Sequence, residues 1–317
     1  MKKLLTQVQQ ALDGVPQFEG IGHHDYTATR LGGLTNLVFR LDPETDHAQK
    51  VFGGKIIVRI PGVGTEEFID RSVEAFNAKQ AELAGVSAKI IQADPVSGVM
   101  ISRCIDRITT MTPELFKSIE GSPARAGAAF RRLHNSGGKF EFRFELFTMI
   151  DEYLEILGTK DIAMPEGYHD VVDAAYPIKA ALEKNPGRLC PCHCDPLCEN
   201  FLDDGTKMWI VDWEYSGQND PLWDLGDLSV EGGFDEDQDM EMLRAYCEGE
   251  PDQDSMARMV IYKAMCDLLW TLWGLIQHAN QNPAEDFWAY SIKRFERCKA
   301  LMNTLEFSHH VKTIAGD

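Results

Sequence analysis

The residues from Leu189 to Asp224 read LCPCHCDPLCENFLDDGTKMWIVDWEYSGQNDPLWD and carry more functional information than the rest of the chain. Asp195 follows His193 with one residue between them, Asn200 comes five residues later, and an apolar run ends at Asp212. An Asp that accepts a hydroxyl proton, with an Asn and a second Asp that bind Mg²⁺, is the minimum set for transferring the γ-phosphoryl group of ATP. Because this transfer depends on positioning and charge neutralisation, a few oxygen ligands at fixed places suffice.

The spacing of these residues has a structural reason. Asp203-Asp204-Gly205 is a hairpin signal between the short apolar run Phe201-Leu202 and the strand-like run Met208–Val211. A hairpin brings its two ends together, so Asn200 and Asp212 are expected to lie side by side. Two oxygen ligands must have this arrangement to share a metal ion.

This segment resembles the catalytic core of the choline/ethanolamine kinases, within the aminoglycoside phosphotransferase and protein-kinase-like superfamily. Bacterial members of the Lic type are the most similar, and the resemblance covers most of the chain. Its further motifs are Leu31–Asn36 (glycine-containing nucleotide loop), Val58–Gly62 (third strand with a basic residue), Asp212–Tyr215 and Asp224–Gly226 (metal-binding pattern), and Trp270–Trp273 and Phe287–Tyr290 (choline-pocket aromatics). The departures are Arg59 in place of Lys and the cysteines around the catalytic loop.

The resemblance implies an α+β, protein-kinase-like bilobal fold with an antiparallel-sheet N-lobe and a mainly helical C-lobe. It also implies ATP- and Mg²⁺-dependent phosphorylation of a small amino alcohol, with choline as the expected acceptor and phosphocholine as the product. Ethanolamine, thiamine and aminoglycosides are alternative acceptors, because a different pocket would keep the same catalytic residues. A non-catalytic nucleotide-binding protein is a further alternative, but it would be expected to lack one of the polar residues, and all are present.

The expected catalytic residues are Asp195, Asn200 and Asp212, and the expected Mg²⁺ ligands are Asn200, Asp212 and Glu214. Glycine lets the backbone approach phosphates closely, and the guanidinium fork of an arginine suits phosphate oxygens. The residues expected to bind ATP are Gly32, Gly33, Leu34, Thr35, Asn36, Arg59, Glu74, Arg103 and Ile105. Within this set, Glu74 is the expected partner that holds Arg59, and the linker from Ser102 to Ile105 is expected to contact the adenine.

The substrate pocket is predicted from aromatic side chains. Trp270 and Trp273 are three residues apart and so share one helix face. Aromatic faces attract a quaternary ammonium group, which has no N–H to donate. A tryptophan stripe at helical spacing is more often core, so the functional interpretation depends on the resemblance. The expected substrate residues are Tyr215, Glu231, Trp270, Trp273, Phe287 and Tyr290, with Glu231 neutralising the ammonium charge.

Four cysteines surround His193 at Cys190, Cys192, Cys194 and Cys198. A structural zinc site usually takes two ligand pairs separated by a linker, and here the thiols alternate within one short segment. We therefore expect small, semi-buried thiols in a reducing cytosol. His193 is expected to organise the loop rather than to act as a base.

Composition points to a soluble cytoplasmic enzyme. The chain has 317 residues and a formal net charge of −19, which argues against nucleic acid as a partner. The acidity either attracts a cationic metabolite or only maintains solubility. The N-terminus lacks an apolar signal region. No stretch is expected to approach the roughly 20 apolar residues needed to cross a bilayer, so no membrane insertion is expected. The composition is compatible with a homodimer.

Periodicity predicts two lobes, residues 1–105 for nucleotide binding and 106–317 for catalysis, the metal site and the substrate pocket. The first hundred residues are expected to hold strands and one helix, from Glu66 to Ala84. Beyond Thr112 we expect mostly helices, one of them capped by Ser122. The two longest are expected last, starting near Asp252 and Pro283.

Overall fold

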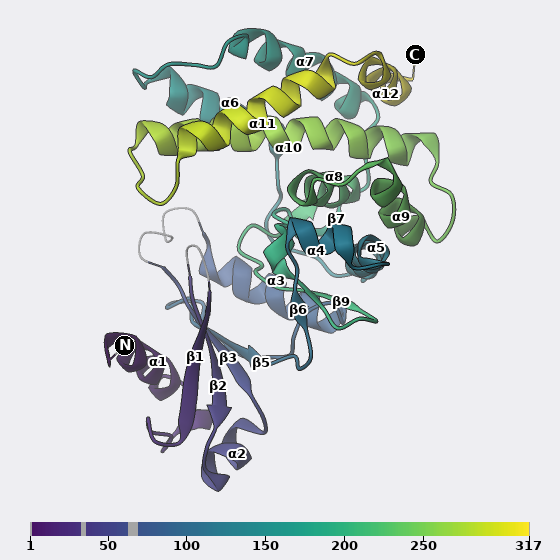
Figure 1. Ribbon diagram of the computed structural model, residues 1–317. Helices are drawn as coiled ribbons and strands as arrows, with labels where there is room; N and C mark the ends of the chain where they lie inside the picture. Colours follow the sequence, from purple (N-terminus) through teal and green to yellow (C-terminus); the bar gives the residue numbers. More distant parts are fainter. Residues whose placement is uncertain (1, 33–35, 63–68, 317) are drawn as a thin grey trace.

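The computed structural model describes residues 2–32, 36–62 and 69–316. Figure 1 shows the main sheet with α1 and α2 in the lower part, and α10 and α11 crossing the upper part with α6, α7 and α12 beyond them. Buried apolar side chains form two clusters, one beneath the sheet and a larger one among the helices. The expected α+β fold, with an antiparallel-sheet N-lobe and a helical C-lobe, is confirmed.

The main sheet has five strands in the order β1-β2-β3-β5-β4, and every neighbouring pair is antiparallel. Their bounds are β1 Tyr26–Gly32, β2 Leu37–Pro43, β3 Ile56–Ile60, β4 Ile90–Ala93 and β5 Met100–Arg103. Two of these pairs, β1 with β2 and β4 with β5, are consecutive in the chain and form hairpins. The first turn falls partly on Gly33, Leu34 and Thr35, which lie outside the described residues.

Two helices of the N-lobe were not predicted, α1 (Lys2–Asp13) and α2 (Asp46–Phe52). The expectation of a single helix was therefore wrong. In α1, Val8 and Leu12 are fully buried in the cluster beneath the sheet. The start of α2 had a recognisable sequence signal, since Thr45 is a favourable N-cap residue. In the structure its side chain accepts a hydrogen bond from the backbone N–H of Ala48.

The helix α3 (Arg71–Leu83) connects the two lobes. It begins after Asp70, whose carboxylate caps the N–H groups of the first turn, and so starts later than the expected Glu66, which lies outside the described residues. Gly85 follows in a left-handed conformation, with φ of 73°, as expected for a residue that ends a helix. Asn77 donates a hydrogen bond to the backbone oxygen of Ser216 at 2.9 Å, which ties α3 to the catalytic segment.

The rest of the chain is mainly helical. Its helices are α4 Pro113–Ser118, α5 Ser122–His134, α6 Leu146–Gly158, α7 Tyr168–Lys184, α8 Pro221–Gly232, α9 Glu236–Cys247, α10 Gln253–Ala279, α11 Phe287–Met302 and α12 Leu305–Ala315. Short strands and 3₁₀ turns connect them and the N-terminal elements: η1 Pro16–Phe18, β6 Thr109–Thr110, β7 Cys190–Cys192, η2 Cys198–Asn200, β8 Phe201–Asp203, β9 Met208–Ile210 and β10 Gly217–Asn219.

Three details of the helices differ from expectation, and one agrees with it. The N-cap of α5 is Gly121, so Ser122 is already its first helical residue. The start of α10 after Asp252 is confirmed, and its 27 residues make it the longest helix described. The second longest is α7 with 17 residues rather than α11 with 16, and α11 begins at Phe287, since Asp286 caps it.

The helix α10 also corrects the expectation that no segment approaches membrane length. Its length and apolar composition are sufficient to cross a bilayer, but 83% of its most apolar window is buried inside the protein. It contacts α6, α8, α11 and α12 and forms the centre of the larger hydrophobic cluster. Its composition is therefore that of a core helix.

The predicted hairpin is formed by β8 and β9, with Phe201 opposite Ile210. Asp204 closes its turn by accepting hydrogen bonds from the N–H groups of Thr206 and Lys207. One step further along, the N–H of Val211 donates to the backbone oxygen of Asn200 at 2.9 Å. The residue before Asp212 is thus paired with Asn200, as the spacing predicted.

Candidate active site

The loop that carries Asp195 is anchored by Asp224 in the first turn of α8. Asp224 is fully buried, and its two carboxylate oxygens accept hydrogen bonds from the backbone N–H groups of His193 at 2.7 Å and Cys194 at 2.8 Å. Cys194 has a φ of 67°, a left-handed conformation that is costly for a residue with a side chain. The carboxylate stabilises this conformation immediately before Asp195.

His134 completes the anchor. Its Nε2 contacts Asp224 at 2.9 Å, and its Nδ1 contacts the Tyr246 hydroxyl at 3.2 Å. The resemblance placed Asp224 in a metal-binding pattern, and the structure instead places its carboxylate against the loop backbone and His134. Sequence reasoning missed this role because the partners are about thirty and ninety residues away.

His193 occupies the position expected of a loop organiser. The ring N–H at Nε2 donates to the backbone oxygen of Val211 at 2.9 Å, and the ring packs edge-on against Trp213, with centroids 4.9 Å apart. Burial lowers the pKa of His193. The ring therefore connects the catalytic loop to the strand that ends at Asp212.

Oxygen ligands gather at the end of that strand. Asp212 has a φ of 68°, and carboxylate oxygens of Asp212, Glu214 and Glu74 lie within 4.8 Å of one another. The amide nitrogen of Asn200 donates to the backbone oxygen of Asp195 at 3.1 Å, which leaves its amide oxygen to bind a cation. Oxygen-rich sets of this kind suit Mg²⁺, so the residues fit the expected ion.

Two arginines bridge these carboxylates. Arg59 contacts Glu74 at 2.5 Å, Glu214 at 3.0 Å and Asp212 at 3.3 Å. Arg71 contacts Glu214 at 2.6 Å and Glu74 at 2.8 Å. The predicted Arg59–Glu74 pair is present, whereas Arg71 was not predicted, although it stands directly after the helix cap at Asp70.

Apart from Arg59 and Glu74, the expected nucleotide residues divide into three groups: Asn36, the loop residues before it, and the linker between the lobes. Asn36 is buried, donates to Glu214 at 2.9 Å and accepts from the N–H of Gly62 at 3.3 Å. Gly32 ends β1, whereas Gly33, Leu34 and Thr35 lie outside the described residues.

The third group is the linker between the lobes. The Arg103 side chain donates a hydrogen bond to the backbone oxygen of Phe52 at the end of α2, so it turns away from Arg59. Ile105 is half-buried. The contact of this linker with adenine stays a prediction.

Burial and mutual repulsion affect the carboxylates of the site. Burial, together with the negative charges of Glu231 and Asp212, raises the pKa of Asp195 to about 8. Partial burial and the charge of Glu214 raise the pKa of Asp212 to about 7, against the opposing effect of Arg59. A bound cation would relieve this repulsion.

The predicted aromatic residues form one continuous cluster. Ring centroids are 6.2 Å apart for Tyr215–Trp270, 6.0 Å for Trp270–Trp273, 5.4 Å for Trp273–Phe287, 6.0 Å for Trp273–Tyr290 and 6.3 Å for Phe287–Tyr290. Trp270 and Phe287 are buried, while Tyr215, Trp273 and Tyr290 keep part of their surface exposed. The close packing of α11 on α10 depends on Gly274 of α10, because a Cβ there would lie 2.3 Å from Ser291 and 2.8 Å from the Tyr290 ring.

Glu231 has a partner that was not predicted. It forms an ion pair with Arg294, whose guanidinium lies 4.7 Å from the centroid of the Tyr290 ring. Arg294 follows Tyr290 by one helical turn, a spacing that could have indicated it. The negative charge of Glu231 reaches Asp195, whose pKa it raises.

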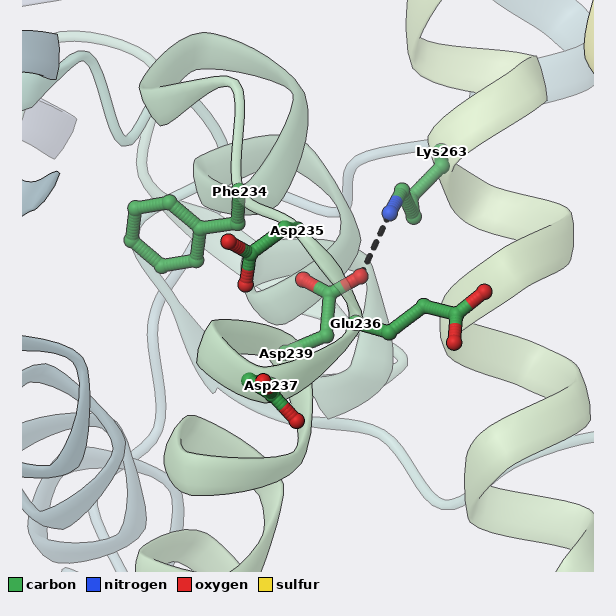
Figure 2. A pocket seen from close by; sticks show the side chains of 6 residues that line it. All are labelled: Phe234, Asp235, Glu236, Asp237, Asp239 and Lys263. Carbon is green, nitrogen blue, oxygen red and sulfur yellow. Dashed lines mark hydrogen bonds and ion pairs between the residues drawn. The ribbon is translucent and has the colours of Figure 1, made fainter.

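A surface pocket lies apart from this site. Figure 2 shows that it is formed at the start of α9 and beside α10, where Lys263 pairs with Asp239 at 2.5 Å. Its lining residues are Phe234, Asp235, Glu236, Asp237, Asp239 and Lys263. It contains none of the predicted catalytic or substrate residues.

All eight cysteines are described and all are free thiols. Cys190, Cys192, Cys194 and Cys198 are fully buried rather than semi-buried. Cys190 and Cys192 share one strand face, with sulfur atoms 3.7 Å apart, and lie close to His134. Both ring nitrogens of His134 are already engaged, which argues against a zinc site there.

Comparison with known proteins agrees with this geometry. The family model for choline/ethanolamine kinase matches residues 28–258. A choline/ethanolamine kinase family protein from Mesorhizobium loti has 54% sequence identity in its crystal structure, which covers 98% of this chain and 99% of that chain with a TM-score of 0.89. Protein LicA of Haemophilus influenzae is 27% identical over 295 residues, 91% of this chain and 83% of that protein.

The choline kinase LicA from Streptococcus pneumoniae shares the fold, with a TM-score of 0.75 at 23% identity, over 95% of this chain and 100% of that one. The family match spans well over half of the chain, including the loop of Asp195, the hairpin and all of α8. The chain therefore belongs to the choline/ethanolamine kinase family and is a small-molecule kinase.

Proposed function

We propose that this kinase transfers the γ-phosphoryl group of ATP, with Mg²⁺, to the hydroxyl of choline and so produces phosphocholine. The observation that supports this most is the placement of Asp195. Burial and the charges of both Glu231 and Asp212 raise its pKa, so Asp195 is within electrostatic reach of both carboxylates. The carboxylates around Asp212 suit a metal-bound nucleotide, and Glu231 suits a cationic alcohol.

At the nucleotide end, Asn200, Asp212 and Glu214 would hold the Mg²⁺, which supplies positive charge to the phosphates when bound. Arg59 and Arg71 supply guanidinium groups beside the same carboxylates. The backbone of the linker at Arg103 and Ile105, and the loop from Gly32 to Asn36, would contact the nucleotide. We assign residues 1–105 and 106–317 to the two lobes on this basis.

At the acceptor end, Asp195 orients the hydroxyl group and accepts its proton during the transfer. Bound Mg²⁺ and a cationic acceptor would offset the negative charges that raise its pKa and so favour the ionised form that can accept the proton. The aromatic cluster gives walls for a quaternary ammonium, and Glu231 adds negative charge. Ethanolamine is the second candidate, because its ammonium group can donate an N–H hydrogen bond to a carboxylate such as that of Asp227, which lies close to Glu231.

The use of ATP and the buried free thiols support a cytoplasmic location. We propose a small-molecule partner only, without nucleic acid or membrane insertion. A homodimer is compatible with this function, because the residues assigned to the site come from one chain.

A substrate panel tests the acceptor directly. Purified protein is incubated with Mg-ATP and with choline, ethanolamine, thiamine or an aminoglycoside, and formation of the phosphorylated product is measured. Choline is expected to give the highest kcat/KM. Turnover of thiamine or an aminoglycoside alone would contradict the proposed acceptor, and no turnover with any would contradict the kinase assignment.

Removal of the metal is expected to abolish turnover, because the phosphate charge then lacks its main neutralising group. Activity is measured in excess EDTA and again after addition of Mg²⁺. Asp212→Asn is expected to raise the Mg²⁺ concentration needed for half-maximal activity. The matched control is Asp204→Asn, in the turn of the same hairpin, which should leave that concentration unchanged. An unchanged requirement in Asp212→Asn would exclude Asp212 as a ligand.

Trp273→Ala is expected to raise the KM for choline much more than the KM for ATP, because Trp273 is the centre of the aromatic cluster. A lost cation–π contact of about 0.5–2 kcal/mol corresponds to a change of roughly 2- to 30-fold. The control is Trp288→Ala, which removes a half-buried tryptophan of α11 that packs on His278. Equal changes in both KM values would show that Trp273 serves only the core.

A further inference from the structure

The helix α8 carries a buried carboxylate, Asp227, to which the proposed mechanism gives no role. Its side chain is 1% exposed. Its Oδ1 accepts a hydrogen bond from the Cys266 thiol at 3.0 Å, while its Oδ2 has no hydrogen-bond partner among the described residues. A buried carboxylate oxygen without a partner is costly, so its retention requires an explanation.

The position of Asp227 is fixed by helix packing. A Cβ on the preceding residue, Gly226, would lie 2.8 Å from the backbone oxygen of Met259, so α8 approaches α10 closely. Asp227 and Glu231 are one helical turn apart and share a face. Oxygen atoms of these two residues and the sulfur of Cys266 lie within 4.8 Å of one another.

The surrounding charges compensate Asp227 only in part, through the charge of Arg294. Arg297 binds both oxygens of Asp267 at 2.6 Å, and Arg294 pairs with Glu231 and, at 3.4 Å, with Asp267. Among the described residues, no ion pair reaches Asp227. Burial and the charges of Glu231 and Asp195 raise its pKa well above the usual value. A cation bound beside Asp227 would lower this pKa and keep the carboxylate ionised, so this cluster of acidic side chains is short of one positive charge.

The missing charge matches the acceptor, and this step rests on the proposed function. In an amino alcohol of this class two carbons separate the hydroxyl from the nitrogen, so an acceptor held at Asp195 places its ammonium group a short distance away. A quaternary ammonium is attracted by charge and by aromatic faces only. An ammonium group with N–H bonds can in addition donate a charge-assisted hydrogen bond to a carboxylate.

We propose that Asp227 is a specificity-determining residue: its free carboxylate oxygen accepts an N–H hydrogen bond from the ammonium group of ethanolamine-type acceptors. Choline has no N–H to donate, so it is attracted only by the negative charge of Asp227. Discrimination between the two acceptors therefore depends on this residue, in addition to the aromatic cluster.

The test compares kcat/KM for ethanolamine and choline in the wild-type protein, in Asp227→Asn and in Asp227→Leu. Both substitutions remove the negative charge for both acceptors, and Leu also removes every hydrogen-bond acceptor at nearly the same size. The ratio of ethanolamine to choline kcat/KM is expected to fall by about 10-fold or more in Asp227→Leu, with a smaller fall in Asp227→Asn.

Cys266→Ser is the matched control, because it keeps a donor to Oδ1 and leaves the carboxylate in place. It should leave the ratio unchanged. Asp227→Asn removes a buried charge without an ionic partner, so its melting temperature is expected to be no lower than that of the wild type.

The outcomes separate this inference from the proposed function. A wild-type protein that phosphorylates neither acceptor overturns the proposed function and this assignment with it. If the wild-type protein phosphorylates both acceptors, and Asp227→Asn, Asp227→Leu and Cys266→Ser all keep its ratio of ethanolamine to choline kcat/KM, only the role of Asp227 is overturned. If the Asp227 variants have a much lower melting temperature than the wild type, a thermal shift assay replaces kinetics. It measures how far ethanolamine and choline each raise the melting temperature of the wild type and of Asp227→Asn. Equal loss of stabilisation by both then overturns the assignment.

Discussion

Asp195→Asn is expected to lower kcat by about 10²- to 10⁴-fold while ATP still binds. Asn has nearly the same size and keeps a hydrogen-bond acceptor, but it cannot take up the proton of the alcohol. Asp195 precedes Pro196 in a loop whose backbone is held by Asp224, so the substitution should not displace its neighbours. Steady-state turnover gives kcat, and a thermal shift with ATP and Mg²⁺ reports binding.

The control is Glu199→Gln, an exposed carboxylate in the same loop, which makes the same change of charge. Its kcat is expected to stay close to that of the wild type. Turnover of Asp195→Asn at the wild-type level would exclude the proton-accepting role. Loss of both turnover and ATP binding would instead show that Asp195 is needed to maintain the structure of the nucleotide site.

Asp224→Ala is expected to lower the free energy of unfolding by about 3–5 kcal/mol and to abolish detectable turnover. The substitution leaves two backbone N–H groups, of His193 and Cys194, and the His134 ring without their partner in a buried place. The left-handed conformation of Cys194 would then lose its support. Chemical denaturation gives the change in stability.

The control is Asp173→Ala on the exposed face of α7, which should change stability by no more than about 0.5 kcal/mol. Asp224→Asn adds a finer test, because an amide keeps one acceptor oxygen and should lose less stability than Ala. A variant with Ala at this position that remains fully active would contradict the anchoring role. In that case the position of Asp195 would be independent of α8.

The local part of the site could be predicted from the sequence alone. The hairpin between Asn200 and Asp212 follows from Asp204-Gly205 and the apolar runs on either side, because turn chemistry and strand alternation act over a few residues. The direction of Arg59, on the strand face opposite to Val58 and Ile60, follows from the same alternation. Its pairing with Glu74 is also present, since a helix that follows a strand packs back onto it.

Other features could not be predicted because they depend on packing between distant segments. The carboxylate of Asp224 reaches the loop before Asp195 only because α8 lies against β7, and Arg71 reaches Glu214 across 143 positions in the chain. The burial of Asp227 depends on the close approach of α8 and α10 at Gly226. Helix periodicity gives the face that each residue occupies but not the identity of the neighbouring helix.

Short-range signals in the sequence therefore specify which residue types are available for phosphoryl transfer and the order in which the hairpin presents them. Which charges meet depends on the packing of distant segments: two arginines with three carboxylates at one end, and Arg294 with Glu231 at the other. The physical reason is that turns and strand faces are fixed by forces between near neighbours. Ion pairing and burial depend on distances that only the packed helices set.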